Sequence, residues 1–72
     1  KKYSYGGWLR VEQGEQRYTN AMYRHILAEN EDGYDRDTQL LHAAHVAWNA
    51  MARLELMLRS GEWSLRYGDD ND

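Results

Sequence analysis

The sequence of 72 residues contains no cysteine, no proline and no phenylalanine. Without cysteine, neither a disulfide nor a thiolate metal site can hold the chain together. An excess of positive charge is also missing: the formal net charge is −3, so the strongly basic face of a nucleic-acid-binding domain is not expected. No apolar run approaches the roughly 18 residues that a membrane-spanning helix needs. These absences favour a cytoplasmic protein that binds neither nucleic acid nor membrane.

The chain is long enough for one small domain. A chain of this size buries only about 60% of the surface that it exposes when unfolded, which is marginal for a monomer. Its bulk comes from six tyrosines, three tryptophans and three methionines, together with a stretch rich in leucine and alanine after Gln39. The sequence opens at Lys1 without an initiator methionine, so we expect the natural protein to begin upstream. We therefore expect a homo-oligomer, or a helix upstream, to complete the core.

The first half of the chain is predicted to be an irregular segment followed by a helix. Residues 1–14 combine aromatic side chains with glycines and show no helical period. A helix is predicted over residues 15–28, because Tyr18, Met22 and Ile26 recur at four-residue spacing.

The second half is predicted to contain an acidic loop over residues 29–37, a helix over 38–59 and a tail over 60–72. Asp37 or Thr38 offers a side-chain oxygen that could cap the second helix. We expect that helix to stop before a glycine in the left-handed conformation, and the end of the tail to be disordered. The predicted fold class is all-α: an antiparallel helix pair with an irregular, aromatic and glycine-containing N-terminal segment packed across it.

At about 100° per residue, the second helix separates into two faces. The apolar arc consists of Leu40, Ala44, Ala47, Met51, Leu54 and Leu58. The polar stripe on the other side consists of His42, His45, Asn49 and Arg53. We interpret the apolar arc as the face that packs in the core, and on this interpretation replacing His42 spares the fold.

The polar stripe has two possible meanings. Two imidazoles at positions i and i+3, as in His42 and His45, can meet one ligand by phosphate hydrogen bonding or as neutral metal ligands. They could equally be the polar face that any surface helix needs. Val46 and Leu56 flank the stripe, which favours a face that is partly covered by other residues over one that is fully exposed to solvent.

The first helix carries cationic and titratable residues as well. His25 lies at the edge of its apolar face. Arg17 and Arg24 lie seven residues apart on an outer face, where they could hold a polyphosphate by bidentate hydrogen bonds or pair with carboxylates.

Two further segments could contact a ligand. The acidic loop over 29–37 holds five of the twelve carboxylates, which could bind Mg²⁺ or could simply favour the start of the following helix. Near the N-terminus, Tyr5 and Trp8 lie beside glycines and could stack on a nucleotide base, or could only cap the core.

Several short motifs follow one another in order along residues 2–58. They are Lys2-Tyr3, Gly7-Trp8, Arg17-Tyr18, Ala21, Arg24-His25, Gly33-x-Asp35-x-Asp37-Thr38, His42-x-Ala44-His45, Asn49 and Leu54-Glu55-Leu56. This order resembles that of the dATP/dGTP diphosphohydrolase-type domain of phages and bacteria, of which the chain would be the C-terminal, two-helix part.

The resemblance implies an all-α fold related to MazG-like nucleotide pyrophosphatases. It also implies cleavage of a purine deoxynucleoside triphosphate to the monophosphate and pyrophosphate with Mg²⁺ or Mn²⁺. His25, His42 and His45 would then be catalytic, with Asp35 and Asp37 on the metal side. The residues expected to bind the purine nucleotide are Arg17, Arg24, Asn49, Tyr5 and Trp8.

The sequence departs from the family pattern in two places. The helix that the family pattern leads us to expect before the Lys-Tyr motif is not among these 72 residues, nor is any carboxylate that it would carry. The turn before His42 has Gln39 and Leu41 where glycine and proline are expected. Two alternatives stay open: a non-hydrolysing nucleotide-binding protein, such as a phage sponge for a signalling nucleotide, and an interaction module whose polar stripe contacts a partner protein. A phage-encoded protein would act in the host cytoplasm.

Overall fold

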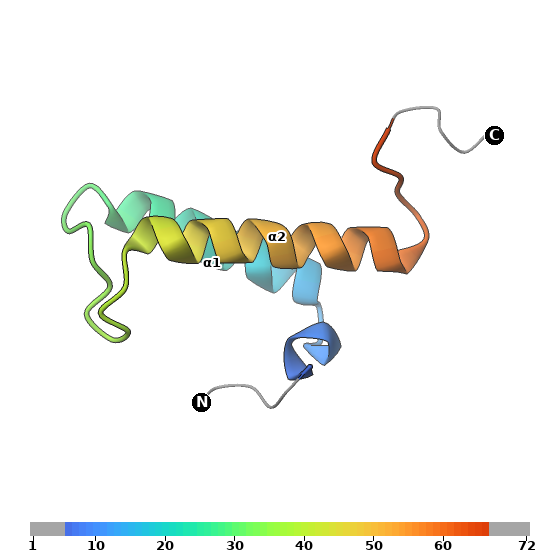
Figure 1. Ribbon diagram of the computed structural model, residues 1–72, viewed down its shortest axis with the longest axis horizontal. Helices are drawn as coiled ribbons and strands as arrows, with labels where there is room; N and C mark the ends of the chain where they lie inside the picture. The colour runs from blue at the N-terminus through green and yellow to red at the C-terminus, as the bar shows by residue number, and fades with distance from the viewer. Residues whose placement is uncertain (1–5, 67–72) are drawn as a thin grey trace.

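A computed structural model describes residues 6–66 of the chain. It contains a short 3₁₀ helix, η1 (Gly7–Arg10), and two α-helices, α1 (Gly14–Ala28) and α2 (His42–Ser60). The two α-helices pack side by side and run in opposite directions, joined by the loop at their shared end (Figure 1). Within residues 6–66 there is no strand, which confirms the all-α helix pair. The predictions for Tyr5 and for the end of the tail lie outside the described residues.

Three of the four α-helix ends lie where the sequence pattern places them, to within one residue. α1 begins at Gly14, one residue before the predicted start, and ends at Ala28. α2 ends at Ser60, and Gly61 follows in the left-handed conformation with φ 82°. The backbone N–H of Gly61 donates to the carbonyl of Leu58 at 3.3 Å, which closes the last turn of the helix.

The predicted start of α2 is wrong. The helix begins at His42, four residues later than the predicted range 38–59. Gln39 adopts the left-handed conformation with φ 68°, which interrupts a right-handed helix at that point. The predicted caps, Asp37 and Thr38, therefore lie within the loop, and the Thr38 hydroxyl accepts a backbone N–H two residues further on at 3.3 Å.

A small aromatic cluster fastens η1 to the helix pair. Tyr18 of α1 is only 3% exposed, and its hydroxyl donates a hydrogen bond to the carbonyl of Trp8 at 2.7 Å. Trp48 of α2 meets both residues edge-on, with ring centroids 5.5 Å from Tyr18 and 5.8 Å from Trp8. Edge-to-face aromatic pairs of this kind stabilise beyond the apolar area that they bury.

The apolar arc of α2 faces away from α1, so its assignment to the core is wrong. Met51 is 68% exposed and Leu54 39% exposed. The polar stripe packs against α1 instead: His42 is 9% exposed and Asn49 6%, beside Ala52 at 3%. Among the described residues, Tyr18 and Ala52 are the only buried hydrophobic side chains.

Hydrogen bonds explain how a polar stripe can pack inside. The Arg53 Nε donates to the Thr19 hydroxyl of α1 at 2.7 Å, and the Asn49 amide donates to the carbonyl of His45 at 2.7 Å. In the part of the chain that the structure describes, no buried side-chain nitrogen or oxygen lacks a hydrogen-bond partner. The cost of removing these groups from water is therefore offset. None of the described helices is long and apolar enough to cross a membrane.

Candidate functional site

Three histidines meet between the helices near the loop. His25 comes from α1, and His42 and His45 come from the first turn of α2; we call these three the histidine cluster. The rings of His25 and His45 are stacked, with centroids 4.4 Å apart and an interplanar angle of 12°. The Nδ1 atoms of His25 and His42 are 2.8 Å apart. The packing of the polar stripe onto α1 brings the cluster together.

The short contact between His25 and His42 restricts their protonation. Two Nδ1 atoms at hydrogen-bond distance require one ring to donate and the other to accept, so at least one imidazole is neutral. Burial lowers the pKa of His25 below its usual value of 6.5, and the nearby His45 and His42 lower it further. The Asp35 carboxylate acts in the opposite direction on this pKa. The balance favours neutral His25, a form that can accept a proton or bind a metal.

Asp35 places a carboxylate beside the cluster. Its Oδ2 lies 3.5 Å from Nε2 of His45, and its Oδ1 accepts the backbone N–H of Asp37 at 2.8 Å. That backbone hydrogen bond is the main cause that lowers the pKa of Asp35 below its usual 3.8, and the nearby His45 lowers it further. The Thr38 hydroxyl lies 2.7 Å from the same Nε2 of His45. Nε2 of His45 thus contacts both the Asp35 carboxylate and the Thr38 hydroxyl.

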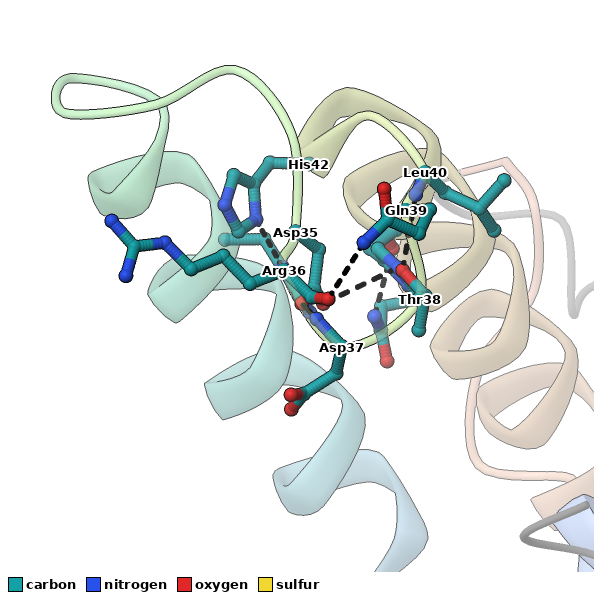
Figure 2. A network of polar contacts seen from close by, with 10 residues as sticks. Asp35, Arg36, Asp37, Thr38, Gln39, Leu40 and His42 are labelled. Carbon is teal, nitrogen blue, oxygen red and sulfur yellow. Dashed lines mark hydrogen bonds and ion pairs between the residues drawn. The ribbon is translucent and has the colours of Figure 1, made fainter.

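The loop is folded tightly enough to hold Asp35 in place. The backbone N–H of Asp35 donates to the carbonyl of Leu40 at 2.8 Å, and the N–H of Gln39 donates to the carbonyl of Asp35 at 2.8 Å. The N–H of His42 donates to the carbonyl of Gly33 at 2.8 Å. Figure 2 shows Asp35 at the centre of this network, with the turn folded around it. Gln39 occupies the left-handed position that a glycine would favour.

A cleft of about 740 Å³ opens beside the cluster, within the range of about 300–1,000 Å³ usual for small-molecule sites. The predicted residues His25, His45, Arg17, Arg24, Asn49, Asp35 and Asp37 line this cleft. Its other lining residues are Tyr18, Asn20, Ala21, Thr38 and Trp48. Arginine and carboxylate groups are therefore present on one concave surface.

Two predicted residues lie elsewhere. Trp8 lines a separate pocket of about 320 Å³ that it shares with Trp48 and Met51. His42 lines a neighbouring pocket of about 530 Å³, where Asp35 and Asp37 also contribute to the wall. His42 therefore does not line the cleft, but it contacts His25, which does.

Sequence reasoning missed Thr38 and Trp48 as parts of the site. Thr38 was assigned to a helix that includes His45, which would place the two residues two turns apart on the helix. The left-handed Gln39 instead turns the chain back, and Thr38 contacts His45. Trp48 lies one position from Asn49, but nothing in the pattern distinguishes it from other aromatic residues.

The donor atoms beside the cleft differ in how well they suit the Mg²⁺ that the resemblance implies. Ligand atoms of His25, Asp35 and His42 all lie within 4.8 Å of one another. Mg²⁺ takes oxygen ligands, whereas imidazole nitrogen suits zinc and related transition metals. The histidine pair therefore does not fit Mg²⁺. The carboxylates of Asp35 and Asp37 on the cleft wall supply the oxygen donors that Mg²⁺ uses beside phosphate groups.

Comparison with known proteins identifies the family. Residues 1–66 match the family model described as dATP/dGTP diphosphohydrolase, N-terminal. No curated protein and no solved structure matches the chain. The matched family is the N-terminal one, so the expectation that the chain is the C-terminal part of such a domain is not confirmed. Because the match spans nearly the whole sequence, the chain belongs to the dATP/dGTP diphosphohydrolase N-terminal family.

Proposed function

We propose that the cleft binds a purine deoxynucleoside triphosphate and that the protein hydrolyses it to the monophosphate and pyrophosphate. One observation carries the proposal: Arg17 and Arg24 line the same cleft as His25, His45 and Asp35. Phosphate recognition and proton transfer would thus be available on one surface. The family to which the chain belongs is described by hydrolysis of dATP and dGTP, which supports the same substrates.

The side chains divide the chemistry between them. The two arginines, Arg17 and Arg24, bind phosphate oxygens through their guanidinium groups. Neutral His25 accepts a proton from water, whose oxygen bonds to the α-phosphorus as the bond to the departing pyrophosphate breaks. Asp35 orients His45 through the contact at Nε2. Mg²⁺ or Mn²⁺ held by Asp35 and Asp37 would, when bound, offset the negative charge of the phosphates.

The test is release of pyrophosphate from dATP and dGTP with Mg²⁺, measured on the intact protein. Arg24→Ala and Arg17→Ala should each weaken nucleotide binding and lower turnover. Arg59→Ala is the matched control, because Arg59 pairs with Glu55 at 2.7 Å in the last turns of α2, away from the cleft. Loss of activity in all three variants alike would contradict a site in this cleft.

The same assay separates the alternative functions. Tight nucleotide binding with no product over hours, with or without metal, would favour a non-hydrolysing nucleotide-binding protein. Neither binding nor turnover across a panel of purine nucleotides would favour the interaction module. The hydrolase proposal requires both binding and metal-dependent product.

We also propose that a second copy of the chain covers the apolar arc of α2. Leu40 of the predicted arc lies in the loop before α2, and the members that α2 carries are leucine, alanine and methionine. Met51 and Leu54 among them are exposed in the helix pair. An uncharged stripe along one helix can pack on the same stripe of a twofold-related copy. The helix pair itself buries few large apolar side chains, so the additional burial would stabilise a chain of this length.

A further inference from the structure

We propose that His25, His42 and Asp35 bind a divalent transition-metal ion of the zinc class, through two imidazole nitrogens and one carboxylate oxygen. The three residues come from α1, α2 and the loop between them, so the ion would connect all three segments. This proposal goes beyond the proposed hydrolysis, because the ion is bound by the protein without a nucleotide. The ion and the base role of His25 exclude each other, because a neutral ring with the ion on Nδ1 carries its proton on Nε2 and has no lone pair to accept another.

The distances suit a shared ion. Two nitrogens that each lie about 2.1 Å from one tetrahedrally coordinated metal are about 3.4 Å apart. The Nδ1 atoms of His25 and His42 are 2.8 Å apart, so the two rings must separate by about 0.6 Å to bind one ion. All three ligand atoms lie within 4.8 Å of one another, so the carboxylate must approach by about 1–2 Å to reach bonding distance. Rotation of the Asp35 side chain would supply this movement.

Neighbouring groups restrict the positions of the His42 and Asp35 side chains. His42 is 9% exposed, which keeps its ring in one position against α1. One Asp35 oxygen accepts the backbone N–H of Asp37, while the other faces His45. A carboxylate that is hydrogen-bonded in this way is oriented for coordination, and such outer contacts raise metal affinity. His45 is thus a positioning residue for Asp35, stacked on the ring of His25.

The donor types decide the class of ion. Two nitrogens and one carboxylate oxygen form one of the ligand sets of catalytic zinc sites, which keep a further position open for water or substrate. Mg²⁺ prefers oxygen donors and gives up its water reluctantly. We therefore expect Zn²⁺ and Co²⁺ to bind at micromolar or lower concentration, and Mg²⁺ not to compete with them at millimolar concentration.

The experiment measures Zn²⁺ binding to the full chain without nucleotide, by competition with a chromogenic chelator, and follows Co²⁺ by its visible absorption. Asp35→Asn removes one charge but keeps an oxygen that can accept the Asp37 N–H. Asp37→Asn is the matched control, because it leaves that backbone N–H in place and alters a carboxylate outside the proposed ligand set. We expect Asp35→Asn and His25→Gln to weaken Zn²⁺ binding at least about tenfold, and Asp37→Asn to leave it unchanged.

A second measurement covers variants of His42 that fail to fold. In the wild-type protein, the imidazole ¹⁵N resonances of His25 and His42 should shift on addition of Zn²⁺ and not of Mg²⁺. The proposal is overturned if wild-type protein does not bind Zn²⁺, if these resonances do not move at saturation, or if Asp37→Asn weakens binding as much as Asp35→Asn. Failure of the zinc-free protein to hydrolyse nucleotide in the presence of Mg²⁺, with Zn²⁺ binding intact, would reject the proposed function alone.

Discussion

Replacing Met51 with glutamate separates two interpretations of α2. If the apolar arc were the core of the helix pair, a charge at this position would unfold the chain. In the structure Met51 is 68% exposed and faces away from α1, so the charge should leave the pair folded. Self-association through the apolar arc should be lost instead.

The expected sizes of the two effects differ enough to measure. An exposed substitution changes the free energy of unfolding of the helix pair by about 0.5 kcal/mol or less, whereas loss of a core side chain costs about 2–5 kcal/mol. Burying a whole methionine side chain contributes about 1.5–3 kcal/mol. Met51 is 68% exposed in the helix pair, so covering the exposed part in a dimer should contribute about 1–2 kcal/mol to association. A twofold interface contains the residue twice, which gives about 2–4 kcal/mol. Dimerisation should weaken by about 30-fold to 700-fold, since each 1.4 kcal/mol is tenfold.

Sedimentation velocity and far-ultraviolet circular dichroism together test this expectation. The wild type should sediment at micromolar concentration as a species larger than the 8.5 kDa chain, and Met51→Glu as a monomer with the same helical signal. Gln16→Glu, at an exposed position of α1, should leave the assembly intact. Loss of helical signal in Met51→Glu at every concentration would refute the packing argued for α2. A wild type that is monomeric and stably folded would refute the association through the apolar arc.

Three further outcomes are expected. The folded state lowers the pKa of His25 below its usual 6.5, chiefly through burial, so the unfolded chain binds more protons as the pH falls through that value. In EDTA, the free energy of unfolding should therefore decrease as the pH drops below about 6.5, as urea titrations at a series of pH values would show; a free energy that does not change with pH in this range would contradict the reasoning. Tyr18→Phe removes the hydrogen bond to the carbonyl of Trp8 and should cost about 0.5–1.5 kcal/mol in the same titration; no change would show that η1 is not held by this bond. Gly61→Ala must adopt φ 82° and should lower stability by about 1 kcal/mol, visible as a lower melting temperature.

The helix pair was predictable from local signals, whereas its packing was not. Four-residue spacing defined α1, and Gly61 defined the end of α2, because both depend on residues close in sequence. The choice of packing face depends on partners far along the chain. Arg53 is satisfied by Thr19, 34 residues away, and His42 by His25, 17 residues away. A helical wheel does not contain those partners, so it assigned the more apolar face to the core.

The same distinction applies to the site. The spacing of His42 and His45 on one helix allowed either a shared ligand or an ordinary polar face, and the structure brings both residues to His25. The contact of Asp35 with His45 depends on the loop closing through the left-handed Gln39, and glutamine gives no sequence signal for that conformation. The loop geometry was therefore the part that the sequence could not provide.

The packing of α2 changes how substitutions in the cluster must be interpreted. His42 was expected to lie opposite the core, so that alanine there would test function alone. The structure buries His42 and joins its Nδ1 to that of His25, which makes the same side chain part of the helix contact. Loss of nucleotide binding in His42→Ala would therefore mix loss of a site group with loosening of α1 from α2. Asp35→Asn avoids this ambiguity, because Asp35 lies on the loop and asparagine can still accept the N–H of Asp37. A functional defect in that variant, with unchanged unfolding, would report on the chemistry of the site alone.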